Sequence, residues 1–322
     1  MVMTIEGCAC LGSFGHGQEA LLAALEGASL SPFTERTDTS GLADFFAARA
    51  LRQCDHFSRL ALLAAARAAQ NAGTNFAGRE DCAIILASGY GPARPTFDFL
   101  DSILDHGETM ASPLAFSLSV HNIPAAIIAK TMGVIGPCAT VCQYESAVAS
   151  GLLLAQSWLD EGRAETVLFG AVDEMTAILK NISARLINER EDRSAPAVRR
   201  ALPLGEAAVF FVLSKDEGRE WPGIGKIETI TVEHLHGDEE STVPVPVDSS
   251  EVRLMSGAFP EKSRAACKAL YGGAAYGNLP VAQALDCALA LSLLQRDGKK
   301  TALCLNQGSG ARSAVTITGS TI

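Results

Sequence analysis

The nine cysteines and six histidines of this chain are the side chains best suited to nucleophilic or metal chemistry. Their spacing argues against a metal centre. The pairs Cys8–Cys10 and Cys138–Cys142 have no second pair at the spacing that zinc sites use. His234–His236, with Asp238 nearby, lies in a polar stretch without a second ligand cluster. We therefore predict no metal site, and reduced cysteines that serve as small apolar side chains.

The elements that must position any site follow from the apolar pattern. Short apolar runs alternate with Ala-rich helical stretches, which is typical of an α/β fold. Residues 214–250 are polar with several prolines, and no element is predicted there. Helices are predicted at 55–73, 97–104, 146–159 and 281–294, and strands at the N-terminus and at 81–88, 140–142, 166–170, 207–213, 301–306 and 314–318.

A strand–helix–strand pattern occurs both before and after residue 175. The sequence therefore predicts two pseudo-equivalent halves, residues 1–175 and a shortened second half of residues 176–322. The densely charged run 188–200 is predicted to be an exposed excursion. No repeat of short period is visible, which excludes a solenoid.

Charge and hydropathy exclude several classes of function. The formal net charge of −10 opposes binding to nucleic acid or to an anionic membrane surface. No apolar run reaches the ~20 residues of a membrane span. The opening residues MVMTIEGCACLG lack a positively charged region and are predicted to be a strand rather than a leader. We expect a soluble, cytoplasmic protein.

Five segments resemble, in the right order, motifs of the β-ketoacyl synthases, the condensing enzymes of fatty-acid and polyketide synthesis. Each motif is weak by itself, but the ordered set spans nearly the whole chain. The segments are the helix Asp55–Ala61 (DHFSRLA), Gly136–Val141 (GPCATV) before the nucleophile position, the strand region Gly162–Ala171, the turn Leu204–Ala208 (LGEAA) and the loop Asn306–Gly310 (NQGSG).

A sixth segment narrows the resemblance. Ser112–Asn122 (SPLAFSLSVHN) is similar to a block of ketosynthase-like proteins linked to aryl-polyene-type pathways, where such proteins pair with an active ketosynthase. The alternative interpretation is that these residues pack the core around a turn.

The resemblance implies that the catalytic positions are replaced. Ketosynthases use a cysteine at the N-terminus of a buried helix, where the helix dipole lowers the thiol pKa, and two histidines. The cysteine position falls on Glu145, and the two histidine positions fall on Ser256 and Gly277. No histidine follows His236, so the usual triad cannot be assembled. Chain-length factors, the inactive partners of ketosynthases, characteristically have Gln at the first position.

The resemblance also implies the architecture and the partners. We expect a thiolase-like fold, with two halves in an αβαβα layered arrangement. The interface strand, Cys138–Cys142 (Cys138, Ala139, Thr140, Val141 and Cys142), would lie at a two-fold interface with a catalytic ketosynthase. Side chains of this subunit would line the acyl tunnel: Met110, Phe116, Leu118 and His121. No cofactor is expected, and an acyl carrier protein would bind through the heterodimer.

Three alternatives remain open. The chain could be a malonyl decarboxylase that uses Glu145. It could be a homodimeric synthase or thiolase with a displaced cysteine nucleophile. It could also be a purely structural relative in another pathway. Separately, the arginines of the run Glu189–Arg200 could face an acidic carrier, although a solvated loop is the commoner role of such a run.

Overall fold

The computed structural model describes residues 1–27, 36–189, 204–216, 223–234, 251–257, 269–308 and 311–319. The strands are β1 (Met3–Gly12), β2 (Gly15–His16), β3 (Cys82–Ser88), β4 (Cys138–Cys142), β5 (Thr166–Asp173), β6 (Ala207–Lys215), β7 (Gly225–His234), β8 (Glu251–Gly257), β9 (Thr301–Gln307) and β10 (Ala311–Gly319).

The α-helices are α1 (Gln18–Glu26), α2 (His56–Asn71), α3 (Ala93–His106), α4 (Pro113–Ser119), α5 (Ile123–Met132), α6 (Ala147–Asp160), α7 (Ala177–Glu189), α10 (Gly273–Tyr276) and α11 (Ala282–Asp297). Short 3-10 turns are η1 (Ser40–Asp44), η2 (Ala48–Leu51), η3 (Glu108–Met110) and η4 (Tyr144–Ser146).

The sheet is built from two sets of strands with the same pairing pattern. Its order is β4-β3-β5-β6-β1-β7-β10-β9-β8, and β2 pairs with β1. In the first set, β3 and β5 are parallel, and β6 is antiparallel to β5 and β1. In the second set, β8 and β9 are parallel, and β10 is antiparallel to β9 and β7. Among the described strands, the short β1–β7 ladder joins the two sets.

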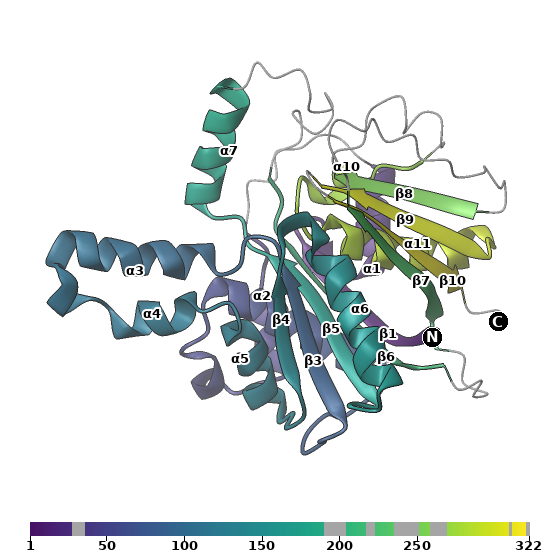
Figure 1. Ribbon diagram of the computed structural model, residues 1–322, viewed down its shortest axis with the longest axis horizontal. Helices are drawn as coiled ribbons and strands as arrows, with labels where there is room; N and C mark the ends of the chain where they lie inside the picture. The colour runs from purple at the N-terminus through teal and green to yellow at the C-terminus, as the bar shows by residue number, and fades with distance from the viewer. Residues whose placement is uncertain are drawn as a thin grey trace.

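Two helices form the middle layer between these sets of strands. Helix α6 contacts β3 and β5 of the first set and β7 and β10 of the second, and α11 contacts β8 and β9 as well as β1 and β6. Helix α2 covers the outer face of the first set, where it packs on β1, β5 and β6 (Figure 1). The arrangement is the predicted thiolase-like α/β fold, which is confirmed.

Local sequence explains why the main elements form. The helix α2 begins after Asp55, whose side chain accepts a hydrogen bond from the amide of Ser58, as an N-cap does. Strand β3 is buried on both faces, which explains its continuous apolar run. Ile84 and Leu86 point into the core under α2, and Ile85 points into the core of the middle layer.

Several predicted elements have different bounds, and some were missed. The Phe-rich helix α3 runs from Ala93 to His106, beyond the predicted 97–104. Strand β7 lies inside the polar run 214–250, where no element was predicted. Much of this strand alternates exposed and half-buried residues, so its apolar pattern is weak. The strand forms because its backbone pairs in ladders with β1 and β10. The predicted boundary near residue 175 falls between β5 and β6, which pair with each other.

Helices α3 and α4 form a hairpin that extends from the body of the molecule, and α7 also stands away from it (Figure 1). Among the described helices, none combines the length and the apolar character that a bilayer-spanning helix requires.

Candidate functional site

Glu145 lies where strand β4 gives way to the middle-layer helix α6. It is the central residue of the 3-10 turn η4, and only 4% of it is exposed. The side-chain amide of Asn306 donates a hydrogen bond to the backbone oxygen of Glu145 at 2.7 Å. Its carboxylate packs on Gly308, where an added Cβ would come within 2.6 Å of Oε2. The loop after β9 therefore encloses this carboxylate at the N-terminus of a buried helix, where negative charge is favoured.

Ser256 belongs to the same buried cluster. It sits at the end of β8, and its hydroxyl lies 3.4 Å from Asn306 Oδ1 and from the backbone oxygen of Leu305. The structure thus joins Ser256 to Glu145 through Asn306, three residues that come from β8, η4 and β9. Neither the hydroxyl of Ser256 nor the amide of Asn306 can act as the proton acceptor that an imidazole provides.

Behind Ser256 lies a buried acid, Asp286 of helix α11. Tyr276 donates its hydroxyl to Asp286 Oδ1 at 2.7 Å. Burial raises the pKa of Asp286 to about 7, and hydrogen bonds from Tyr276 and Ser256 oppose the shift. Its Oδ2 is buried without a hydrogen-bond partner among the described residues. A protonated carboxyl explains such an arrangement, because the neutral acid is the form that burial favours.

Gly277, the predicted second histidine position, caps α10 with a φ of 82°. It packs against Gly205 of the turn before β6, and the amide of Gly205 donates to the oxygen of Asn278 at 3.1 Å. The described contacts of Gly277 are thus with this turn.

The four predicted tunnel residues lie on or beside the α3–α4 hairpin. Met110 is 67% exposed and Phe116 is 55% exposed. The Phe116 ring contacts Phe99 of α3, with centroids 5.2 Å apart. Leu118 is half-buried, and the His121 ring packs against Gly91. None of the four is a core residue, so the alternative that this block packs the core does not hold for them.

Strand β4, which was predicted to lie at an interface, is the outermost strand of the first set and, within the described residues, pairs with β3. Cys138 and Cys142 at its ends are exposed, and the three residues between them are half-buried. Partial burial raises the pKa of both thiols above the ordinary cysteine value. A raised pKa opposes formation of the thiolate that a displaced cysteine nucleophile would need.

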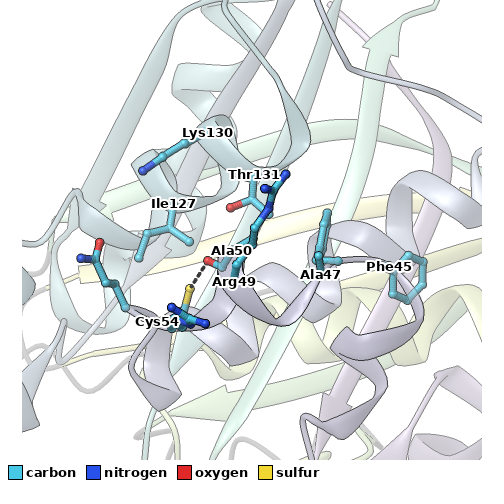
Figure 2. Close-up of a pocket in the computed structure, with 11 residues that line it drawn as sticks. Phe45, Ala47, Arg49, Ala50, Cys54, Ile127, Lys130 and Thr131 are labelled. Carbon is cyan, nitrogen blue, oxygen red and sulfur yellow. Dashed lines mark hydrogen bonds between the residues drawn. The ribbon is translucent and has the colours of Figure 1, made fainter.

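A pocket of about 610 Å³ opens between η2 and helix α5 (Figure 2). Three cationic side chains line it, those of Arg49, Arg52 and Lys130, together with apolar groups such as Phe45 and Ile127. No carboxylate lines it, although the chain as a whole carries a formal charge of −10. The negative charge of the whole chain gives no indication of this local positive surface. The close spacing of Arg49 and Arg52 was the sequence signal that could have revealed it.

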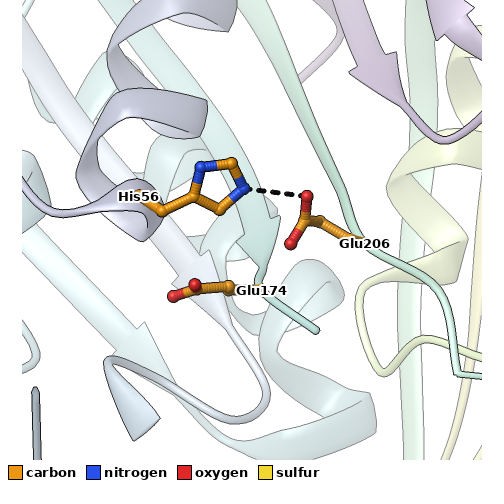
Figure 3. Close-up of side chains that lie close together, drawn as sticks. All are labelled: His56, Glu174 and Glu206. Atoms are coloured by element: carbon orange, nitrogen blue, oxygen red, sulfur yellow. Dashed lines mark hydrogen bonds and ion pairs between the residues drawn. The ribbon is translucent and has the colours of Figure 1, made fainter. Parts of the chain in front are cut away.

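A second polar cluster consists of His56, Glu174 and Glu206 (Figure 3). His56 Nε2 lies 2.9 Å from Glu206 Oε1, which also accepts the amide of Thr37 at 2.8 Å. Arg36 pairs with Glu174 at 2.6 Å. Because each carboxylate already has a cationic or amide partner, this cluster is a network that fastens residues 36–37 to α2 and to the end of β5.

The other candidates do not form sites in the described residues. His234 ends strand β7 rather than lying in a loop, and His236 and Asp238 are outside the described residues, as are Arg190, Arg193, Arg199 and Arg200. The eight described cysteines carry free thiols.

Sequence comparison identifies one family. Residues 38–204, just over half of the chain, match the model of the β-ketoacyl synthase N-terminal domain. No curated protein matches the chain significantly.

Solved structures resemble the chain over its whole length. The ishigamide ketosynthase/chain length factor superposes with a TM-score of 0.77 at 17% identity, covering 99% of both chains. A type II polyketide acyl-carrier protein in complex with its ketosynthase bound to the hexaketide gives 0.78 at 14% identity, again with 99% of both chains. A β-ketoacyl synthase from Burkholderia phymatum STM815 gives 0.76 at 14%, with the same coverage. At these identities the likeness concerns the fold.

Proposed function

Because the chain belongs to the β-ketoacyl synthase family, we propose that it is the non-catalytic, chain-length-factor-like subunit of a ketosynthase pair. The observation that carries the proposal is the site around Glu145. A buried carboxylate occupies the start of the middle-layer helix, Asn306 bonds the backbone oxygen of this residue, and Ser256 bonds Asn306. A condensing site needs a thiol nucleophile that carries the acyl chain as a thioester and imidazoles that stabilise the enolate. The chain has no histidine after residue 236 to supply them.

The open edge of β4 supports pairing with a second subunit. An edge strand presents unpaired backbone groups, and natural proteins protect such edges with charges or cover them. Strand β4 (CATVC) has no charged residue. Exposed apolar side chains flank it in the sequence, Ile135 before the strand and Tyr144 after it, and others lie on or beside the α3–α4 hairpin: Leu100, Leu104, Met110, Leu114, Phe116 and Val120. A surface of this kind is typical of an interface.

The expected partner is a catalytic ketosynthase, in polyketide, aryl-polyene or fatty-acid chain elongation. The ishigamide structure is of a ketosynthase/chain length factor, and this relative has the same fold as the chain. In such a pair the active subunit supplies the nucleophile and the histidines, and this chain shapes the far end of the acyl tunnel.

The cationic pocket supports contact with an acyl carrier protein within the complex. Carrier proteins are acidic, and a positive surface attracts them despite the negative charge of the whole chain. The Arg49→Glu/Arg52→Glu double variant should weaken carrier binding to the complex at least about tenfold. Arg94→Glu is the matched control, because Arg94 is 61% exposed on α3 and lies outside the pocket. Equal loss in both variants would argue for a diffuse charge effect instead.

Activity of the isolated chain tests the absence of catalysis. Incubation with acyl- and malonyl-carrier protein should give no β-ketoacyl product, and clear turnover without a partner would refute the proposal. Release of CO₂ without condensation would instead identify a malonyl decarboxylase. In that case Glu145→Ala should abolish the release.

Co-expression tests the pairing. The ketosynthase encoded by a neighbouring reading frame should copurify with the chain and raise its soluble yield, because the apolar surface beside β4 is then covered. A well-behaved monomer at micromolar concentration would count against an obligate pair.

A further inference from the structure

Two tyrosines lie together where strands β3 and β4 end. Tyr90 follows β3 and Tyr144 follows β4, and these strands are parallel neighbours, so their carboxyl ends meet at one edge of the sheet. The two rings are in edge-to-face contact, with centroids 5.7 Å apart and planes at 67°. Tyr144 is 45% exposed and directly precedes Glu145.

The backbone of Tyr144 is strained. Its φ of 49° makes it the one non-glycine residue with a positive φ in the described part of the chain. The left-handed region disfavours residues with a Cβ, and a bulky aromatic residue is an unusual occupant. Such strain persists only where the surroundings impose it, and it concentrates at functional sites.

Tyr90 is held by a buried scaffold. Asp173 Oδ1 accepts hydrogen bonds from the amides of Gly89 at 3.0 Å and Tyr90 at 2.9 Å, and from the Ser88 hydroxyl at 2.8 Å. The Cys142 thiol, at the end of β4, reaches the Gly89 oxygen at 3.8 Å. These contacts fix the turn that carries Tyr90 relative to the strand that leads to Tyr144.

The turn that carries Tyr90 also meets His121, one of the predicted tunnel residues. The His121 ring packs against Gly91, one residue beyond Tyr90, with Cδ2 2.5 Å from the position of an added Cβ. The pair therefore lies between the end of the interface strand and the segment that carries His121. Tyr144 is exposed and Tyr90 is half-buried, so part of the pair is open to a partner subunit.

We propose that the Tyr90–Tyr144 pair forms part of the wall that stops a linear acyl chain from extending further in the complex, alongside the predicted tunnel residue Phe116, with Tyr144 as a residue that limits chain length. This inference rests on the proposed function. Two rigid rings in contact form a barrier that loses little conformational entropy when it meets a ligand. Their phenol hydroxyls add polar groups with which a hydrocarbon chain forms no hydrogen bonds, so further extension past them is unfavourable.

The test compares products of complexes that differ only at this pair. The chain is co-expressed with the neighbouring ketosynthase, and product lengths are measured by mass spectrometry. Tyr144→Gly should shift products longer by about one or two two-carbon units, because it removes the ring and leaves space. Its melting temperature should not fall, since glycine accepts a positive φ freely.

Further variants keep the test decisive. Tyr144→Asn also tolerates the left-handed backbone and should lengthen products if the glycine variant loosens the segment. Tyr144→Phe keeps the ring and should leave product length unchanged. Tyr90→Leu should give a smaller lengthening than Tyr144→Gly. Ile182→Ala, at a 42% exposed position of helix α7, is the control for loss of exposed apolar surface outside the proposed interface.

The outcomes separate the inference from the function on which it rests. If the wild-type chain copurifies and sets product length but Tyr144→Gly and Tyr144→Asn leave it unchanged, the Tyr90–Tyr144 wall is refuted and the proposed function stands. If the wild-type chain neither pairs with the ketosynthase nor alters its products, both fail.

Discussion

The two outermost strands, β4 and β8, lie at opposite ends of the same sheet and are packed differently. The interior of β8 is fully buried, with only its end residues half-exposed. Strand β4 has both ends exposed and a half-buried interior. The difference has a backbone cause. Leu270 exchanges hydrogen bonds with the far side of β8, through the amide of Met255 and the oxygen of Arg253.

Strand β4 has β3 on one side and, within the described residues, no strand on the other. An edge strand that stays uncovered normally carries charged residues or proline, which prevent pairing with another chain. The lack of charge in β4 is therefore informative. Within the described residues, the edge at β8 is therefore paired through Leu270, whereas the edge at β4 has no such partner, and the proposed function assigns that edge to the second subunit. The predictions below test that difference.

The largest effect is expected at β8. Leu254 is fully buried in the middle-layer core, so Leu254→Ala should lower the free energy of unfolding by about 2–5 kcal/mol. Val141→Ala in the half-buried β4 should cost less than about 1 kcal/mol in the isolated chain. Urea unfolding measures both. Equal losses would mean that β4 is as well packed as β8.

Each half contains a buried acid, and both make stability depend on pH. Burial raises the pKa of Asp173 to about 6 and that of Asp286 to about 7, whereas an ordinary aspartate has a pKa of 3.8. Between the ordinary pKa of 3.8 and these raised pKa values, the folded chain binds more protons than the unfolded chain. Stability therefore falls as the pH rises over this range, and the loss is complete near pH 6 for Asp173 and near pH 7 for Asp286. The loss is on the order of 3 kcal/mol for Asp173 and 4 kcal/mol for Asp286.

Asp286→Asn should remove the upper part of this pH dependence, because an amide keeps an acceptor for Tyr276 and does not ionise. Melting temperatures between pH 5 and pH 8 measure it. An unchanged profile in the variant would show that Asp286 does not titrate in this range.

The next effect concerns the complex. Ile84 donates its amide to the oxygen of Pro137, so in this parallel ladder the amide of Thr140 faces away from β3. Thr140→Pro should spare the isolated fold and weaken the ketosynthase complex at least about 100-fold, or about 2.8 kcal/mol. Thr140→Val, which keeps the amide, is the control. Calorimetric titration of the partner measures both, and intact binding by the proline variant would exclude strand pairing at this edge.

The smallest effect on stability is expected at Phe116. Its ring is 55% exposed and touches Phe99, so Phe116→Ala should cost about 0.5–1.5 kcal/mol rather than the 3–5 kcal/mol of a core phenylalanine. In the complex it should lengthen products by roughly two to four carbons. Product distribution and melting temperature are measured together, with Leu114→Ala on the same helix as control. A large stability loss without longer products would assign Phe116 to the core.

The sequence by itself determined the fold class and most of the elements. The buried strand before Ser88, the Asp-capped helix at His56 and the Ala-rich helices α6 and α11 have strong local signals, because burial on one or both faces dictates residue type at each position. The ordered motifs also located Glu145 and Ser256, which the structure joins through Asn306.

Only the tertiary structure decided the rest. Strand β7 has little apolar pattern and exists through its ladders with β1 and β10. The cationic pocket joins Arg49 and Arg52 to Lys130, which lies far along the chain. The pairing of Tyr90 with Tyr144 and the positive φ of Tyr144 likewise depend on where β3 and β4 end in space. The pattern of apolar residues within one segment indicates which of its residues are buried. These features instead depend on contacts between distant segments, which no single stretch of sequence encodes.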